Sequence, residues 1–267
     1  MLNILYESEK NNSKLIQSMK NNNIDLKYIE LGNEMYSKSY SWVYEDAESY
    51  IKGVEKNYAA IKNSYPDAKI GLVVSPISFA GNSNPEPNGK PSKSWPKKLR
   101  DYDILSANSM FSDALVIHVY GHPYNNKWLK SNPITFEEHF LTVMEHFNNK
   151  FDVSMQYLQK LGNNKPVWIT EWGVTAPADK RKGLFREYKK SAFHALYVAS
   201  VLSSITLDDR VEIANYHIIR DLWKSTKNGY EITDVGKVLS LFIASAKSSD
   251  IAYKVDVNLK KTGLKVL

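Results

Sequence analysis

Several common features are missing from this sequence of 267 residues. It contains no cysteine, which excludes disulfide bonds and thiolate metal sites and leaves the cellular compartment undetermined. No apolar run approaches the roughly 18 residues of a membrane-spanning helix, and Met1 to Lys10 lacks the apolar core of a signal peptide. We therefore expect neither a disulfide framework nor a membrane partner.

Two further absences reduce the classes of cofactor and partner that we expect. The sequence has no HExxH motif, no glycine-rich phosphate loop and no clustered His and Asp spacing, so we expect no metal ion and no other cofactor. The net charge of +6 is spread along the chain without a lysine-rich or arginine-rich block. A basic balance can suit nucleic acid or acidic polysaccharide, but dispersed lysines are more typical of a solvated surface, and we expect no nucleic-acid partner.

The chain instead contains short apolar runs that alternate with helical patterns. Strand-like runs occur at Leu2 to Tyr6, Leu26 to Leu31, Lys69 to Val74, Ala114 to Tyr120, Val167 to Thr170 and Val211 to His217. Helical spacing occurs at Ser13 to Lys20 after a Ser cap, and at Ala47 to Ser64, Phe136 to Leu161, Lys189 to Leu202 and Val235 to Ala246. The segment Gly81 to Pro96 is rich in Asn, Pro, Gly and Ser and predicts a long loop. The alternation favours a parallel sheet with crossover helices.

Two of the predicted strands end on a glutamate. The segment from Tyr28 reads Tyr-Ile-Glu-Leu-Gly-Asn-Glu and ends at Glu34, and the segment from Pro166 reads Pro-Val-Trp-Ile-Thr-Glu-Trp and carries Glu171. A parallel barrel brings the ends of its strands to one catalytic rim. Two carboxylates there can cleave a glycosidic bond, one by protonating the leaving oxygen and one by attacking or by activating water. The alternative is that both glutamates are solvated charges at strand ends.

These segments resemble the signature of clan A glycoside hydrolases, which are retaining enzymes built on a (β/α)8 TIM barrel. The resemblance implies that Glu34 is the acid/base, that Asn33 binds the sugar 2-hydroxyl and that Glu171 is the nucleophile. It also implies a double displacement on the O-glycosidic bonds of a polysaccharide or oligosaccharide, and a tyrosine that orients the nucleophile, for which we choose Tyr120. His118 lies two residues earlier and faces the same way, either in the site or as a core histidine.

Other residues near the predicted strand ends could bind a carbohydrate substrate. Aromatic rings stack on the apolar faces of sugars, and histidines hydrogen-bond to hydroxyl groups. The alternative for each of them is core packing. The substrate-binding candidates are Asn33, His118, Tyr120, His122, Trp172, His217 and Trp223.

The resemblance leaves too few residues before Glu34. If Glu34 follows the fourth barrel strand, three βα units of roughly 30 residues each should precede it. We therefore expect a partial barrel, about strands 3 to 8, in residues 1–248, and the start of a C-terminal β region in residues 249–267. A second chain or a missing N-terminal segment would cover the open sheet edges. The resemblance implies a secreted full-length parent, and the alternative function is an inert remnant or a carbohydrate-binding protein.

Overall fold

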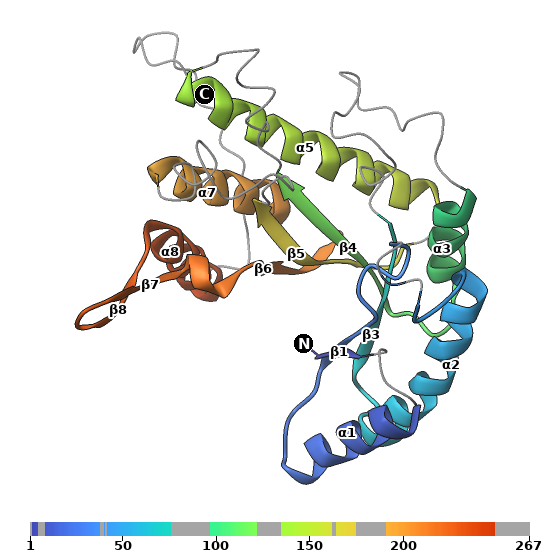
Figure 1. Ribbon diagram of the computed structural model, residues 1–267. Helices are drawn as coiled ribbons and strands as arrows, with labels where there is room; N and C mark the ends of the chain where they lie inside the picture. Colours follow the sequence, from blue (N-terminus) through green and yellow to red (C-terminus); the bar gives the residue numbers. More distant parts are fainter. Residues whose placement is uncertain are drawn as a thin grey trace. The chain divides into compact units, whose positions relative to one another are not determined.

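A computed structural model describes residues 2–4, 9–37, 40, 42–75, 97–121, 135–161, 164–174 and 191–248 (Figure 1). The chain forms two compact units, each described by itself below. Unit 1 contains Met1–His118, Lys150–Thr170 and Arg210–Ala214, and unit 2 contains Val119–Asn149, Glu171–Asp209 and Asn215–Leu267. The predicted loop Gly81 to Pro96 and the predicted C-terminal β region 249–267 lie outside the described residues.

Six strands form one sheet whose order follows the chain, β1-β2-β3-β4-β5-β6. The pairs β1–β2, β2–β3 and β3–β4 are parallel, with Ile29 opposite Ile70 and Leu72 opposite Leu115. Parallel strands that follow the order of the chain, with helices between them, form a partial (β/α)-barrel-type fold, which confirms the predicted fold class. The strands are β1 Leu2–Ile4, β2 Tyr28–Leu31, β3 Lys69–Val73, β4 Ala114–Gly121, β5 Val167–Val174 and β6 Val211–Tyr216.

Helices follow the strands as the sequence pattern predicts. In unit 1 the helices α1 and α2 lie side by side (Figure 1), joined by a buried hydrogen bond of 2.8 Å between Asn12 and Asn57. Helix α2 begins after Asp46, whose side chain accepts from the Ser49 amide at 2.8 Å in a capping box. The helices are α1 Glu9–Asn21, α2 Ala47–Ser64, α3 Lys97–Asn108, α5 Phe136–Lys160, α7 Ala192–Thr206 and α8 Asp234–Ser248.

Unit 2 also contains a short antiparallel hairpin after the sheet. The 3-10 helix η3, Ile219–Asp221, leads into β7, Trp223–Thr226, which pairs with β8, Gly229–Ile232. Helix α8 follows and packs against α7. Neither this hairpin nor α3 is predicted from the sequence pattern.

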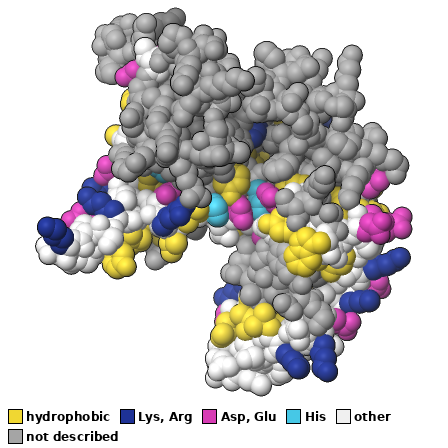
Figure 2. Space-filling model, in the orientation of Figure 1, with side chains coloured by type: hydrophobic (Ala, Val, Ile, Leu, Met, Phe, Trp, Pro, Cys, Tyr) yellow, Lys and Arg dark blue, Asp and Glu magenta, His cyan; other side chains and the backbone are white. Residues whose placement is uncertain are grey.

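The surface charges of the described residues are mixed in sign. Figure 2 shows Lys and Arg side chains interspersed with Asp and Glu side chains on the face in view. On α2, for example, Lys52, Glu55 and Lys56 are all exposed. This pattern agrees with the dispersed charge of the sequence.

Two predicted boundaries are corrected. Helix α1 begins at Glu9, so Ser13 lies inside the helix and is not its cap. Strand β5 continues to Val174, so Glu171 lies within the strand and not at its end. The sequence pattern does not predict this continuation, because Gly173 is a residue type that is depleted in strands. Here glycine is needed, because a Cβ atom on it would lie 2.5 Å from the carbonyl oxygen of His217.

Strands β2 and β3 of unit 1 are buried on both faces, as is typical of parallel strands covered on both sides. Ile29, Leu31, Ile70 and Leu72 are fully buried on one face, and Glu30 and Val73 are buried on the other. Gly71 lies between Ile70 and Leu72, and a Cβ atom on it would lie 2.5 Å from Cε3 of Trp168. Glycine at this position therefore makes room for the indole ring of β5.

A buried carboxyl group lies beside the end of β3. Asp103 of α3 is fully buried and accepts hydrogen bonds from the Ser75 amide at 2.6 Å, from the Ser75 hydroxyl at 3.1 Å and from the Tyr157 hydroxyl at 2.9 Å. Burial raises the pKa of Asp103 to about 7, although these three donors act in the opposite direction. The carboxyl group of Asp103 thereby joins α3 to Tyr157 of α5 and to Ser75, which lies two residues after the end of β3.

Candidate active site

The turn after β2 holds Glu34 in an unusual backbone conformation. Gly32 has φ +96°, which glycine adopts freely, but Glu34 has φ +47°, in the left-handed region that few non-glycine residues enter. A hydrogen bond of 2.6 Å from the Ser37 amide to the Glu34 carbonyl closes the turn. Such conformations cost roughly 1–3 kcal/mol and concentrate at functional sites. The backbone therefore marks Glu34 as a candidate independently of its carboxyl group.

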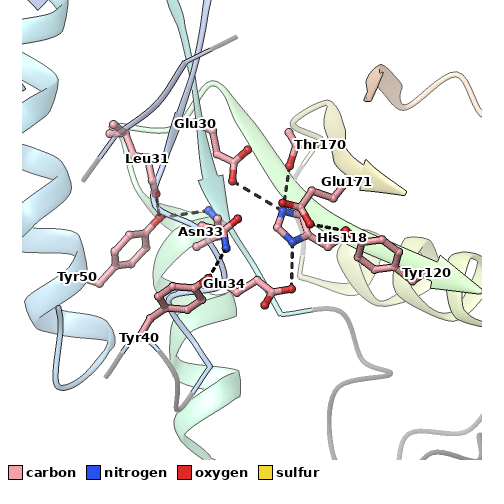
Figure 3. Close-up of polar contacts among 11 residues, drawn as sticks. Glu30, Leu31, Asn33, Glu34, Tyr40, Tyr50, His118, Tyr120, Thr170 and Glu171 are labelled. Atoms are coloured by element: carbon pink, nitrogen blue, oxygen red, sulfur yellow. Dashed lines mark hydrogen bonds and ion pairs between the residues drawn. The ribbon is translucent and has the colours of Figure 1, made fainter. Parts of the chain in front are cut away.

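In unit 1 the Glu34 side chain contacts His118 of β4 (Figure 3). The distance from His118 Nδ1 to Glu34 Oε1 is 3.1 Å, and the distance from His118 Nε2 to the Thr170 hydroxyl of β5 is also 3.1 Å. A second carboxyl group, that of Glu30 in β2, lies 3.8 Å from His118 Nε2. His118 and Glu30 are buried, whereas the Glu34 side chain is 21% exposed. One imidazole ring thus lies between two glutamates, of which only Glu34 reaches solvent appreciably.

In unit 2 the carboxyl group of Glu171 contacts Tyr120 (Figure 3). The Tyr120 hydroxyl donates a hydrogen bond to Glu171 Oε2, and both side chains are partly buried. The His217 ring lies edge-on to the Tyr120 ring, with 5.8 Å between the ring centroids. The structure therefore brings together Tyr120 and Glu171, and their predicted roles stay predictions.

In unit 2, the Tyr197 side chain of α7 joins β4 to β5 by hydrogen bonds. Its buried hydroxyl donates to the Gly173 carbonyl at 2.8 Å and accepts from the Gly121 amide at 3.1 Å. Gly121 follows Tyr120 directly, and Gly173 lies two residues after Glu171. In unit 1, Tyr50 does the same for β2 and β3, since its hydroxyl donates to the Leu31 carbonyl at 2.7 Å and accepts from the Val73 amide at 3.2 Å. Each tyrosine joins the carboxyl ends of two neighbouring strands.

The remaining predicted residues have different environments. Asn33 donates to the Tyr40 hydroxyl at 3.0 Å and is partly buried. Trp172 is 1% exposed, packs edge-on against Tyr216 with 5.0 Å between centroids, and has no hydrogen-bond partner for Nε1 among the residues described. The burial of Trp172 in unit 2 agrees with the core-packing alternative, and its predicted role in substrate binding stays a prediction. Trp223 is 49% exposed on β7. His217 is exposed, and His122 lies outside the described residues.

Two residues of the site are missed by sequence reasoning. Thr170 is the residue before Glu171, and nothing in its type indicates that its hydroxyl contacts a histidine. Glu30 carries a clearer signal, because a charged residue stands between the apolar residues Ile29 and Leu31 in a strand buried on both faces. Buried charges are rare unless they are paired, so Glu30 could have been identified as a site residue.

The described part of the chain contains no cluster of three or more His, Asp or Glu side chains that could hold a metal ion. Among the same residues, no helix has the length and apolar character needed to cross a membrane.

The fold is similar to that of solved glycoside hydrolases. No protein-family model matches the sequence, and no curated protein matches it. An α-L-arabinofuranosidase from Thermotoga maritima has TM-score 0.53 and 14% identity over 90% of this chain and 48% of its own. A GH51 arabinofuranosidase from Xanthomonas axonopodis pv. citri has TM-score 0.52 and 14% identity over 88% and 49% of the two chains. A family 44 xyloglucanase from Paenibacillus polymyxa has TM-score 0.54 and 13% identity over 87% and 48%.

These similarities define the class of fold. Families 51 and 44 belong to clan A, so the predicted resemblance is confirmed at the level of the fold. At 13–14% identity the similarity shows the fold alone. The chain spans about half the length of these solved structures, with 48% or 49% of each covered.

Proposed function

We propose that this chain carries the two catalytic carboxyl groups of a retaining glycoside hydrolase, with Glu34 as acid/base and Glu171 as nucleophile. One observation carries the proposal: β4 supplies a partner for each carboxyl group. His118 contacts Glu34, and Tyr120, two residues further along the strand, donates to Glu171. Alternate residues of a strand point to the same face, so a single short segment serves both glutamates.

The environment of Glu171 suits a nucleophile. An ionised carboxylate accepts hydrogen bonds only, and the Tyr120 hydroxyl is a neutral donor aimed at one of its oxygens. A nucleophile of this kind attacks the anomeric carbon and forms a covalent glycosyl ester while the leaving oxygen takes a proton from the acid. Tyr120 would hold the attacking carboxylate in one orientation.

The environment of Glu34 suits an acid/base. Its side chain is partly exposed, so it can reach a leaving group and later a water molecule. His118 Nδ1 can donate to a Glu34 carboxylate or accept from its protonated form, and the two steps of a retaining reaction require both forms in turn. Retention also requires the carboxyl groups of Glu34 and Glu171 to lie about 5–5.5 Å apart around one glycosidic bond.

The proposed substrate class is carbohydrate, and the solved proteins of similar fold suggest which sugars to test. The solved structures of similar fold include arabinofuranosidases and a xyloglucanase. Asn33 precedes the acid/base and is partly exposed, which suits a hydrogen bond to a sugar hydroxyl. Aryl arabinofuranosides, aryl xylosides, arabinan and xyloglucan are therefore the first substrates to screen.

The experiment uses Glu171→Ala and Glu34→Ala with aryl glycosides of different leaving groups. We expect Glu171→Ala to lose hydrolysis and to regain cleavage of the aryl glycoside when azide is added, because azide attacks in place of the carboxylate, releases the aryl alcohol and gives a glycosyl azide of inverted anomeric configuration. We expect Glu34→Ala to keep most of its activity on dinitrophenyl glycosides, which need little protonation, and to lose activity on natural glycosides.

Glu55→Ala is the matched control, because it removes an exposed glutamate from the outer helix α2. It should match the parent on every substrate and should not respond to azide. If Glu171→Ala also matches the parent throughout, Glu171 has no part in the mechanism. Sugar binding without hydrolysis by the parent chain would instead support the carbohydrate-binding alternative.

A further inference from the structure

Glu30 is the part of the site in unit 1 that the proposed chemistry leaves unexplained. It lies in β2, four residues before Glu34, and its side chain is 4% exposed. A carboxylate in the interior is costly unless a charge or hydrogen bond compensates it. Among the residues described, His118 is an ionisable base that faces Glu30, with its Nε2 3.8 Å from Glu30 Oε1.

The contacts of His118 restrict the positions of its protons. A neutral imidazole carries one proton, on either Nδ1 or Nε2. If the proton were on Nδ1 alone, the lone pair of Nε2 would face the Glu30 carboxyl group. If the proton is on Nε2, it points toward Glu30 and the Thr170 hydroxyl, and Nδ1 is left to accept from a protonated Glu34.

We propose that Glu30 is a positioning residue: its buried carboxylate keeps a proton on Nε2 of His118, so that Nδ1 shares a single further proton with Glu34. This inference rests on the proposed function for its catalytic consequence, although the position of the proton can be measured without any activity. The shared proton lies on Glu34 while His118 is neutral and on Nδ1 when His118 is an imidazolium, and the total is the same in both states.

Two other described groups near this cluster, Thr170 and Tyr50, do not compete for the proton on Nε2. Thr170 is not ionisable in the working pH range, and its hydroxyl can accept from Nε2 as readily as it donates. Tyr50 lies near Glu30, but its own hydroxyl proton is donated to the Leu31 carbonyl. Burial raises the pKa of Tyr50 well above its ordinary value, and the charge of Glu30 adds to this rise, so Tyr50 stays a neutral phenol.

The inference has a consequence for the pH dependence of hydrolysis. A buried negative charge within about 4–6 Å of an ionisable group shifts its proton equilibrium by roughly 1–3 pH units. Glu30 therefore favours the protonated form of His118 over its neutral form. Without the charge of Glu30, the acid form is lost at lower pH, and the basic limb of the pH-rate profile moves down.

The direct test is 15N NMR of histidine-labelled protein between pH 5 and 9, with His118 assigned by its loss in His118→Asn. In the parent chain we expect Nε2 of His118 to stay protonated throughout and only Nδ1 to titrate. In Glu30→Gln, which keeps the shape and removes the charge, the Nε2 signal should move toward that of an unprotonated nitrogen at high pH. In Thr170→Val, which removes the other contact of Nε2, the proton on Nε2 should remain.

The outcomes separate this inference from the proposed function. A parent chain in which Nε2 is unprotonated at neutral pH overturns the inference without any variant, and so does a change in Thr170→Val that is absent from Glu30→Gln. With an aryl glycoside of poor leaving group, Glu30→Gln should move the basic limb of kcat/KM to lower pH by about one unit. An unchanged limb in the presence of the expected NMR result refutes the catalytic consequence, and absence of hydrolysis by the parent counts against the proposed function alone.

Discussion

Asp103 should make the stability of this protein fall as the pH rises. Its pKa is about 7 in the folded chain against an ordinary value of 3.8, because burial disfavours the charged form. The folded state therefore binds this proton more tightly than the unfolded state. The stabilisation is complete below about pH 4 and is lost as the pH rises through about 7. A shift of about 3 units corresponds to about 4 kcal/mol in total, of which about 2–3 kcal/mol is lost between pH 5 and pH 8.

Asp103→Asn tests this reasoning, because asparagine is neutral at every pH and can still accept from the Ser75 amide. The assay is urea denaturation of parent and variant at pH 5, 6, 7 and 8, with the free energy of unfolding compared at each pH. The variant should gain about 2–3 kcal/mol relative to the parent between pH 5 and pH 8. Other titrating groups are common to both proteins and cancel in the difference.

Tyr157→Phe is the matched control and should give the opposite sign. The Tyr157 hydroxyl donates to Asp103 and favours its ionised form, so its removal raises the pKa of Asp103 further. This variant should therefore be more destabilised at pH 8 than at pH 5. A difference between Asp103→Asn and the parent that stays constant from pH 5 to pH 8 would refute the argument.

Two further predictions concern the backbone around the proposed site. In urea denaturation, the free energy of unfolding of Glu34→Gly should exceed that of Glu34→Ala by about 1 kcal/mol. Both variants lack the carboxyl group, and only glycine fits φ +47° without strain. Equal stability of the two variants would show that the turn relaxes. Tyr197→Phe should destabilise the chain by roughly 2 kcal/mol, because the Gly121 amide and the Gly173 carbonyl lose a buried partner, and a loss below about 0.5 kcal/mol would show that water or a shift of the backbone replaces the hydroxyl.

The fold follows from the sequence wherever local pattern and tertiary environment agree. The bounds of α2 are predicted correctly as Ala47 to Ser64, because its apolar face repeats at helical spacing and Asp46 caps it. Strand β2 is also recognised, since it is a short run of residues typical of strands. Helix α3 is missed because its charged residues give a weak apolar face and it follows the proline-rich segment that ends at Pro96.

The proposed site is predictable in part for a similar reason. Glu34 and Glu171 stand in recognisable sequence segments, although Glu171 lies within β5, and the two-residue spacing of His118 and Tyr120 places both side chains on one face of β4. The contacts of His118 with Glu30 and Thr170 depend on how β2, β4 and β5 approach one another, which no local pattern contains. The left-handed conformation of Glu34 cannot be predicted from the sequence either, because glutamate is not a residue type that favours a positive φ.

Side-chain contacts also join three strands of unit 1 near their amino ends. Glu212 of β6 accepts from Trp168 Nε1 of β5 at 2.9 Å and pairs with Lys69 at the start of β3. Partial burial raises the pKa of Glu212, but the hydrogen bonds from Lys69 and Trp168 outweigh it and hold this pKa below its ordinary value.

Glu212, Trp168 and Lys69 lie at or near the starts of β6, β5 and β3, whereas Glu34 follows the end of β2. In a barrel the amino-terminal face serves stability and the carboxyl-terminal face serves chemistry. Loops at the carboxyl ends of the strands can therefore diverge, by drift or in a directed-evolution library, while the contacts of Glu212 with Lys69 and Trp168 hold β3, β5 and β6 together.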